Sequence, residues 1–220
     1  MKSAAFKKTY GSQTAISVPE LEWKAGVIYA VIGANGSGKS TLAKILSGVL
    51  SSDSDTRVIS EERIGYLSQK PYAFRMRAEK NLYLNGADHD RAEALMSALG
   101  LDALRRKQAH HLSGGETAKL ALARLLMRDY ELLILDEPTA AMDMESTLAA
   151  ESLIQRYRDN SSCAVILITH SLQQARRIAD QILYLEQGEL IEAGEAESML
   201  KCPSEPATKR FLHFFGFENL

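Results

Sequence analysis

The sequence VIYAVIGANGSGKST, residues 27–41, joins a short apolar run to a glycine-rich turn and the start of a helix. The run at 27–32 has the length of a buried strand and breaks at Gly33. Beyond Ser40, apolar residues recur at the three- and four-residue spacing of an amphipathic helix. They are Leu42, Ile45, Leu46, Val49 and Leu50. A buried strand, a glycine turn and a helix in this order predict one unit of an α/β fold with a parallel sheet.

Residues 33–40 match the pattern G-x-x-x-x-G-K-[ST]. Such glycines let backbone N–H groups curl around phosphate oxygens, and the helix that follows presents its positive end to them. Lys39 can reach the terminal phosphates, and the Ser40 hydroxyl can bind Mg²⁺. A plain glycine-rich turn is the alternative, but the flanking strand and helix favour phosphate binding. The residues predicted to bind phosphate are Gly33, Ala34, Asn35, Gly36, Ser37, Gly38, Lys39, Ser40 and Thr41.

Two further apolar runs, residues 132–135 and 165–168, also have strand length, and each follows a helical pattern. Helices between strands predict a doubly wound sheet, which binds ligands beyond the carboxyl ends of its strands. The segment 71–112 has a helical stripe instead, with Asp88 as its expected N-cap and Gly100 as its expected stop. This segment predicts a small helical insertion in the sheet domain.

Acidic residues and a histidine follow two of the predicted strands. Asp136 ends the run at 132–135, where it can hold Mg²⁺, usually through water. Glu137 beside it can orient and deprotonate an attacking water molecule. His170 lies at the same expected sheet edge, where it can contact the γ-phosphate and Glu137. An acidic turn and a surface histidine are the alternatives. Together with the glycine-rich loop, however, these residues predict the catalytic groups of a nucleotide hydrolase.

The segment Leu112-Ser113-Gly114-Gly115-Glu116 allows two interpretations. Ser113 with Glu116 three residues later is a capping box, which can start a helix over residues 117–128. A helix start whose two glycines expose backbone N–H groups is also a phosphate site. In the second interpretation the chain has two phosphate-binding elements but one acidic cluster for magnesium.

Composition and charge exclude several classes of protein. The chain of 220 residues has 26 Lys and Arg against 28 Asp and Glu, a net charge of −2, which argues against nucleic acid as a partner. Two cysteines, Cys163 and Cys202, exclude a disulfide-dense secreted scaffold. No segment reaches the ~18–20 apolar residues of a membrane-spanning helix, and the N-terminus lacks the apolar stretch of a signal peptide. We therefore expect a reduced, cytosolic protein, which reaches a membrane only through another protein.

Six motifs in this order resemble the ATPase domain of ABC transporters, and together they cover nearly the whole chain. They are residues 33–41, Gln69, 112–116, 132–137, 140–143 and His170. The resemblance implies a P-loop NTPase fold, with a mainly parallel sheet flanked by helices and a helical subdomain inserted between the glutamine loop and the signature motif. The implied single ABC ATPase domain covers 1–220, with a nucleotide-binding core at 1–70 and 113–200, the helical subdomain at 71–112 and a C-terminal tail at 201–220.

The resemblance also implies roles around one nucleotide. ATP is the substrate, and Tyr10 stacks on its adenine base, a contact that contributes about 1–3 kcal/mol. Ser40, Gln69 and Asp136 bind Mg²⁺, and Gln69 also senses the partner subunit. Glu137 and His170 are then the catalytic pair.

Further implied roles lie between two subunits. In the family, Ser113, Gly114, Gly115 and Glu116 contact the ATP of the opposite subunit. Two chains then sandwich two nucleotides, which accounts for the second phosphate-binding element. Asp143 takes part in dimer communication, although its tetrad reads Ala-Ala-Met-Asp where the family commonly has Ser-Ala-Leu-Asp.

The arrangement of motifs selects among the classes of ABC protein. Only residues 42–111 separate the first phosphate motif from the signature, too few for the coiled coils of chromosome and DNA-repair members. Translation factors carry two such domains in one chain, and fused exporters carry membrane spans. A separate ATPase subunit of a transporter, most often an importer, remains. A soluble ABC ATPase of iron–sulfur cluster assembly is the alternative, and a non-hydrolysing regulator ranks third because Glu137 and His170 are intact.

An importer subunit implies partners. We expect a second copy of the chain or a homologous ATPase subunit, an integral membrane permease and a solute-binding protein. Residues 71–74 would lie where the family docks its permease, or would fill the core of the helical insertion. The expected location is the cytoplasmic face of a membrane, held there by the permease. The runs at 171–180 and 214–220 are similar to those of tungstate and molybdate importer ATPases.

Overall fold

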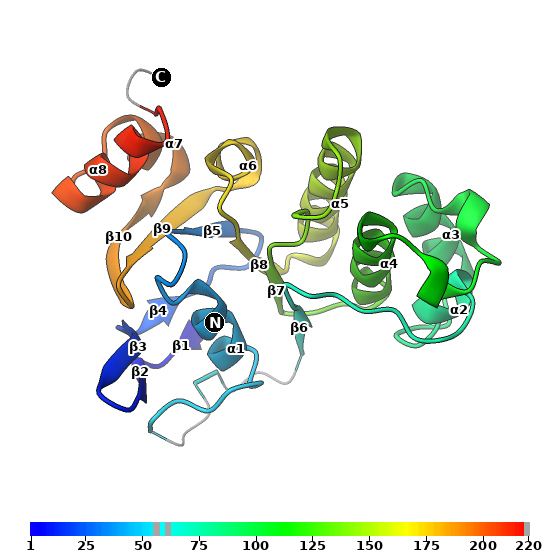
Figure 1. Cartoon of the computed structure of the whole chain (residues 1–220), viewed down its shortest axis with the longest axis horizontal. Helices are drawn as coiled ribbons and strands as arrows, with labels where there is room; N and C mark the ends of the chain where they lie inside the picture. The colour runs from blue at the N-terminus through cyan, green and yellow to red at the C-terminus, as the bar shows by residue number, and fades with distance from the viewer. Residues whose placement is uncertain (55–57, 60–62, 218–220) are drawn as a thin grey trace.

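A long mixed sheet runs through the centre of the computed structural model, which describes residues 1–54, 58–59 and 63–217 (Figure 1). Within these residues the sheet has eight strands in the order β2-β3-β10-β9-β5-β8-β7-β6. Their bounds are β2 Phe6–Tyr10, β3 Gln13–Val18, β5 Ile28–Ile32, β6 Ile64–Leu67, β7 Leu132–Asp136, β8 Ala164–Ile168, β9 Gln181–Glu186 and β10 Glu189–Glu195. A separate two-stranded sheet pairs β1 (Lys2–Ser3) with β4 (Leu21–Glu22).

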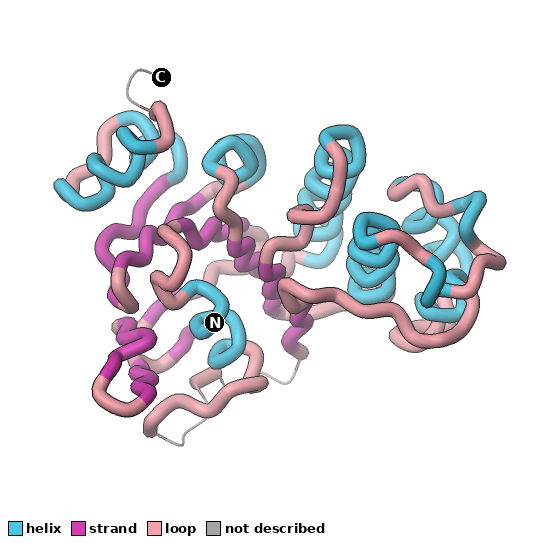
Figure 2. Tube along the Cα trace, viewed as in Figure 1, coloured by secondary structure: helices cyan, strands magenta, loops and turns pink. Residues whose placement is uncertain are grey.

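Helices cover both faces of the long sheet (Figure 2). On one face α1 (Lys39–Leu46) shares a buried cluster with side chains of β3, β5 and β9. The opposite face packs against five helices in two further clusters. These helices are α4 (Gly114–Leu126), α5 (Met144–Ser161), α6 (Leu172–Ile178), α7 (Ala196–Lys201) and α8 (Pro206–Phe214). The layers are those of a P-loop NTPase, as the sequence predicts.

The central strands are parallel and buried along their whole length. In β8, Ile166 and Ile168 pack toward α1, whereas Val165 and Leu167 pack toward α4 and α5. Both faces of such a strand must be apolar because successive side chains point to opposite sides. This explains why the sequence shows continuous apolar runs at β5, β7 and β8 rather than alternation.

A helical region lies at the end of the molecule far from α8 (Figure 1). It contains α2 (Ala78–Leu82), α3 (His89–Ala98) and two short 3₁₀ turns, Asp102–Leu104 and Ala109–His111. Its apolar side chains pack on α4 in the same cluster as β7 and β8. The predicted ends of α3 are confirmed, since Asp88 Oδ1 accepts a hydrogen bond from Arg91 N at 2.9 Å and Gly100 follows the helix with φ +64°.

Helix α4 begins one turn before the residue that the sequence predicts. Its start at Gly114, rather than Thr117, follows from a complete capping box. Glu116 N donates to Ser113 Oγ at 3.2 Å, and Ser113 N donates to Glu116 Oε2 at 2.7 Å. These two bonds satisfy backbone N–H groups at the helix start, so the glycines become part of the helix.

The helices in the described ranges are too short or too polar to cross a bilayer.

Near the C-terminus, Phe211 packs on Tyr184 with ring centroids 4.8 Å apart, and Phe217 is buried. Phe214 and Phe215 instead face solvent. The phenylalanine stripe is therefore divided between core and surface.

Replacing Tyr157 with phenylalanine tests one anchor of this fold. The Tyr157 hydroxyl donates to Arg128 O at 2.9 Å and accepts from Tyr130 N at 3.0 Å. Because Tyr157→Phe leaves both backbone groups without this partner, we expect it to lower the free energy of unfolding by about 1–3 kcal/mol. Urea denaturation measures the change. The control Tyr83→Phe removes an exposed hydroxyl, bonded to His89 at 3.0 Å, and should change stability by about 0.5 kcal/mol or less. If both variants lowered the free energy of unfolding equally, the anchoring role of the Tyr157 hydroxyl would be contradicted.

Candidate functional site

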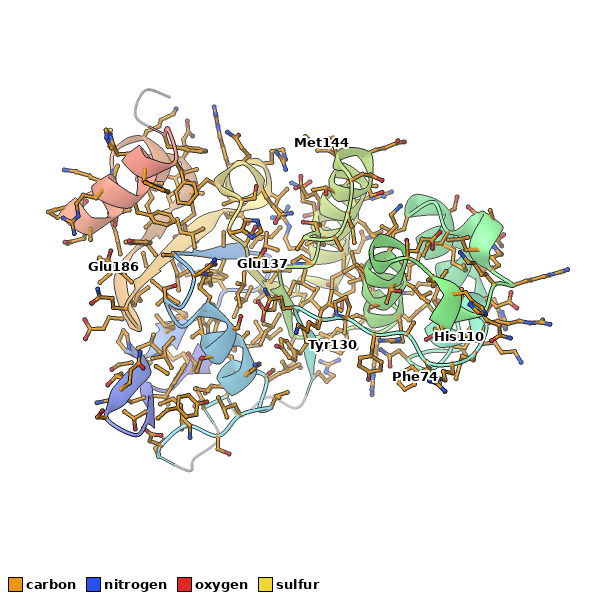
Figure 3. All side chains as sticks on the ribbon, in the orientation of Figure 1. Phe74, His110, Tyr130, Glu137, Met144 and Glu186 are labelled. Atoms are coloured by element: carbon orange, nitrogen blue, oxygen red, sulfur yellow. The ribbon has the colours of Figure 1, made fainter. Side chains whose placement is uncertain are left out.

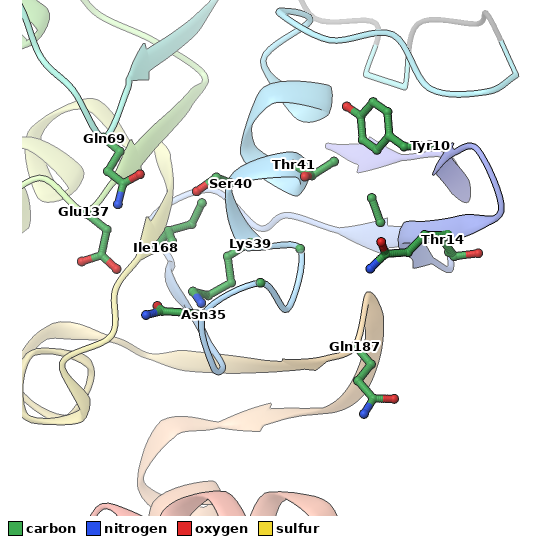
Figure 4. Close-up of a pocket in the computed structure, with 14 residues that line it drawn as sticks. Tyr10, Thr14, Asn35, Lys39, Ser40, Thr41, Gln69, Glu137, Ile168 and Gln187 are labelled. Carbon is green, nitrogen blue, oxygen red and sulfur yellow. The ribbon is translucent and has the colours of Figure 1, made fainter.

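A cavity of about 670 Å³ opens beside the carboxyl ends of β5 and β7, above the start of α1 (Figure 4). Nine residues that the sequence assigns to the nucleotide, the metal or catalysis line it. They are Tyr10, Asn35, Gly36, Gly38, Lys39, Ser40, Thr41, Gln69 and Glu137. We call this the phosphate-loop cavity. The strands place its walls together because Val31 of β5 and Asp136 of β7 are each paired with Ile168 of β8.

The glycine-rich loop packs against backbone on both sides. Gly33 has φ +149°, and a Cβ atom there would lie 2.2 Å from Leu185 O. Gly38 has φ +99°, and its Cβ would lie 2.7 Å from Ala15 O. Only glycine fits at both positions, because the conformation disfavours other residues and backbone atoms cannot yield as a flexible side chain can. The tight curve leads directly into α1.

Lys39 is held inside its own loop. Its Nζ donates to Gly33 O and to Ala34 O, both at 2.8 Å, and the residue is 8% exposed. Burial lowers the pKa of Lys39, while the nearby Glu137 and Asp136 carboxylates act in the opposite direction. Among the described residues no carboxylate pairs directly with this ammonium group, so its buried charge is compensated by carbonyl dipoles.

Ser40 and Asp136 bring oxygen atoms together from α1 and β7. Ser40 Oγ donates to Asp136 Oδ1 at 3.2 Å, and Asp136 is 1% exposed. Burial raises the pKa of Asp136, while the hydrogen bond from Ser40 lowers it. Hydroxyl and carboxylate oxygens are donors that Mg²⁺ accepts, and a buried carboxylate gains from a nearby cation. Gln69, which follows β6, lies close to Glu137 at this edge (Figure 4). The donor set therefore fits the predicted Mg²⁺.

Glu137 and His170, the predicted catalytic pair, are in contact. Glu137 Oε2 lies 2.8 Å from His170 Nδ1, and the Glu137 N–H donates to Ile168 O at 3.0 Å. The backbone of Glu137 is left-handed, with φ +53°. This conformation is unfavourable for residues other than glycine and is often found at functional sites. The Glu137 side chain is 10% exposed and that of His170 65% exposed, so the pair joins the cavity wall to solvent.

The signature residues lie outside this cavity. Of the described residues, those that line the phosphate-loop cavity do not include Ser113, Gly114, Gly115 or Glu116. A Cβ atom at Gly115 would lie 2.7 Å from Ala141 O, so the signature packs directly on the loop after β7. Asp143, further along this loop, caps α5 by accepting from Ser146 N at 2.8 Å, which lowers the pKa of its carboxyl.

Three polar residues that sequence reasoning missed also line the cavity: Gln13, Thr14 and Gln187. Gln187 and Gly188 form the tight turn between β9 and β10, with φ +49° and +84°. Gly188 N donates to Ser37 O at 3.2 Å, which fixes this turn beside the glycine-rich loop. A glycine between two apolar runs indicates a hairpin, but its position next to the loop follows only from the strand order.

Comparison with known proteins agrees with this geometry. The family model described as ABC transporter matches residues 17–140. The tungstate uptake system ATP-binding protein TupC of Peptoclostridium acidaminophilum is 39% identical over 203 residues, covering 85% of this chain and 94% of TupC. A phosphate import ATP-binding protein of Aliivibrio fischeri is 32% identical over 235 aligned positions, covering 92% of this chain and 86% of that protein. Both relatives serve uptake, which favours a transport ATPase over iron–sulfur cluster assembly.

A solved structure has the same fold. It is a dimeric ATP-binding cassette in a post-hydrolysis state, bound to ADP and Pi. The TM-score is 0.76 at 21% sequence identity, covering 89% of this chain and 99% of that chain. The chain belongs to the ATP-binding proteins of ABC transporters, as an ATPase subunit of the kind that powers import.

Proposed function

We propose that this chain binds ATP·Mg²⁺ in the phosphate-loop cavity and hydrolyses it with Glu137 as general base and His170 as the γ-phosphate contact. The observation that supports this most is the meeting of three groups at one sheet edge. A buried lysine, a pair of a half-buried serine and a buried aspartate, and a glutamate–histidine pair all lie beside the same cavity. Their chemistry matches the parts of a phosphoryl-transfer site: a phosphate ligand, a metal site and a water-orienting acid.

In this proposal the glycine-rich loop positions the triphosphate. Backbone N–H groups and the N-terminus of α1 face the phosphates, and Lys39 exchanges its two carbonyl partners for phosphate oxygens. Ser40, Gln69 and Asp136 would hold Mg²⁺, which when bound supplies positive charge to the β- and γ-phosphates. Tyr10, at the end of β2, stacks on the adenine base.

Glu137 then acts on the water molecule that attacks the γ-phosphate. Its carboxylate accepts the proton, and His170 holds the γ-phosphate in line. Positioning and charge stabilisation supply most of the catalysis. The contact of 2.8 Å between Glu137 and His170 keeps the two groups in one arrangement before ATP arrives.

A second chain completes the site in this proposal. Ser113, Gly114 and Gly115 lie outside their own cavity, so they are available to close over the γ-phosphate of a partner. Asp143 lies on the loop against which Gly115 packs, so closure of the dimer can change the surroundings of Asp143. Hydrolysis then reopens the dimer.

The proposed membrane partner is a permease that docks in a groove of about 350 Å³. The docking groove lies between the end of β6, the turn after α2 and α4, and its exposed apolar side chains are Tyr72, Phe74 and Leu84. Arg124 of α4 lies 5.1 Å from the ring centroids of both Tyr72 and Phe74, which fixes the two rings. Figure 3 shows Phe74 on the helical side of the molecule, apart from Glu137.

The permease would hold the chain on the cytoplasmic face of the membrane, with a solute-binding protein on the other side. The likeness to TupC supports an oxyanion such as tungstate as the transported solute. We also propose the division into a nucleotide-binding core at 1–70 and 113–200, a helical subdomain at 71–112 and a tail at 201–220.

Lys39→Ala should weaken nucleotide binding strongly. Because hydrogen bonds to charged groups contribute about 1.5–3 kcal/mol, the dissociation constant of ATP should rise about tenfold or more. Binding of a fluorescent ATP analogue measures this. The control Lys44→Ala removes an exposed lysine of the same helix and should leave binding unchanged. Normal binding by Lys39→Ala would exclude the phosphate-loop assignment.

Glu137→Gln should lower ATP turnover by about 10²–10⁴-fold while ATP affinity is retained, since the amide cannot accept the proton. Steady-state phosphate release measures turnover, and light scattering with ATP and Mg²⁺ should detect a dimer that persists. Glu145→Gln makes the same change at an exposed position nearby and should hydrolyse ATP normally. Wild-type turnover by Glu137→Gln would rule out Glu137 as the base.

Leu84→Glu should weaken docking without affecting ATP hydrolysis by the isolated chain. The side chain is 49% exposed in the docking groove, so a charge there is tolerated in the free protein but opposes an apolar contact. Co-purification from native membranes in mild detergent, read by mass spectrometry, should lose the polytopic membrane protein. Leu148→Glu, at a 44% exposed position on α5, is the control. Equal recovery with both variants would contradict this groove as the docking site.

A further inference from the structure

A buried polar cluster lies between α5 and α6, which run next to each other on one face of the sheet (Figure 1). Glu151 and Gln174 are each 2% exposed. Arg177 donates to both carboxylate oxygens of Glu151, at 2.7 and 2.6 Å. Gln174 Nε2 donates to Glu151 Oε1 at 3.1 Å. The ion pair therefore fixes the end of the Gln174 side chain in space.

The same nitrogen of Gln174 reaches the loop that carries Glu137. Gln174 Nε2 donates to Thr139 Oγ1 at 3.0 Å, so both N–H bonds of the amide are used. Thr139 lies two residues after Glu137, inside a turn in which Ala140 N donates to Glu137 O at 3.3 Å. We call the hydrogen bond between Thr139 and Gln174 the Gln174 link.

The other end of the link is tied to His170. Gln174 lies in the first turn of α6, where its backbone N donates to Ser171 Oγ at 3.2 Å. Ser171 N in turn donates to Thr169 Oγ1 at 3.0 Å, so the residues on both sides of His170 are fixed. Two side-chain contacts thus tie the loop after β7 to the segment after β8: the Glu137–His170 contact reaches the loop, and the Gln174 link reaches the first turn of α6.

We propose that Gln174 and Thr139 are positioning residues, which hold the Glu137 carboxylate in contact with His170. Glu151 and Arg177 fix the Gln174 side chain in place. The inference rests on the catalytic roles proposed above. Glu137 has a left-handed backbone, φ +53°, which persists only where surrounding bonds determine it. The Gln174 link supplies such a bond two residues away, and because Gln174 is buried, loss of the bond would leave a buried amide hydrogen without its partner.

The variants Gln174→Met and Thr139→Val test the link from its two sides. Methionine keeps the length of the side chain but donates no hydrogen bond, and valine keeps the shape of threonine but lacks the hydroxyl. Each should lower kcat about tenfold or more, because small displacements of catalytic groups cost up to about 10²-fold. The KM for ATP should stay within about twofold of wild type. Thr139→Ser retains the hydroxyl, so its kcat should stay close to the wild-type value.

A double mutant and a stability control separate positioning from general packing. Because both single variants break the same bond, Thr139→Val with Gln174→Met should lower kcat no further than one of them alone. Ile154→Val removes a buried methylene group of α5 from the apolar cluster that it shares with β8, and leaves every hydrogen-bonding group of the polar cluster in place. It should lower the midpoint of urea denaturation while kcat is unchanged.

Wild-type kcat in Gln174→Met and Thr139→Val, alongside an inactive Glu137→Gln, would overturn the positioning role and leave the proposed base intact. Fully additive losses, or an Ile154→Val variant as slow as the link variants, would overturn it as well. A Glu137→Gln variant with normal turnover would instead show that the proposed function itself has failed.

Discussion

The site depends on a place where two backbones touch. The glycine-rich loop lies so close to β9 that a Cβ atom at Gly33 would be 2.2 Å from Leu185 O. This contact sets the height of the loop above the sheet, and with it the entry into α1 and the position of Lys39. A larger residue would push the loop away from β9 and so change the position of Lys39 relative to Asp136 and Glu137. The spacing between Lys39 and Asp136, the proposed phosphate and metal ligands, therefore depends on backbone packing as well as on the side chains themselves.

The side-chain charges around the cavity do not by themselves favour a triphosphate. One buried ammonium group, Lys39, faces two carboxylates, Asp136 and Glu137, so the cavity alone has little positive charge to offer a triphosphate. The N-terminus of α1 adds a partial positive charge. The proposed Mg²⁺ and the N-terminus of a partner's α4 would add the rest. In the proposed function, the metal and the second subunit therefore each contribute positive charge that the cavity alone lacks.

The sequence predicts the parts of this protein that are written in short local patterns. The strands β5, β7 and β8 are visible as apolar runs because both of their faces are buried, and residues 33–41 and Ser113 are visible because caps and phosphate loops need particular residue types. The capping box of Ser113 and Glu116 is also visible, but the sequence prediction begins α4 at Thr117, whereas a Ser113 N-cap makes Gly114 the first helical residue. Gln187 and the Gln174 link were missed because both depend on which strands and helices become neighbours. No local pattern encodes that choice.

The capping box at the start of α4 has a consequence for association. Ser113 Oγ accepts from Glu116 N at 3.2 Å, and the backbone N–H and the side chain of Ser113 both hydrogen-bond to the Glu116 carboxylate, which helps to lower the pKa of that carboxyl. The helix start is therefore held by bonds within its own cap. Its backbone is also already fixed in the single chain, where Gly115 rests on Ala141 O. A partner's nucleotide would meet a rigid surface, and little conformational entropy would be lost there when two chains associate.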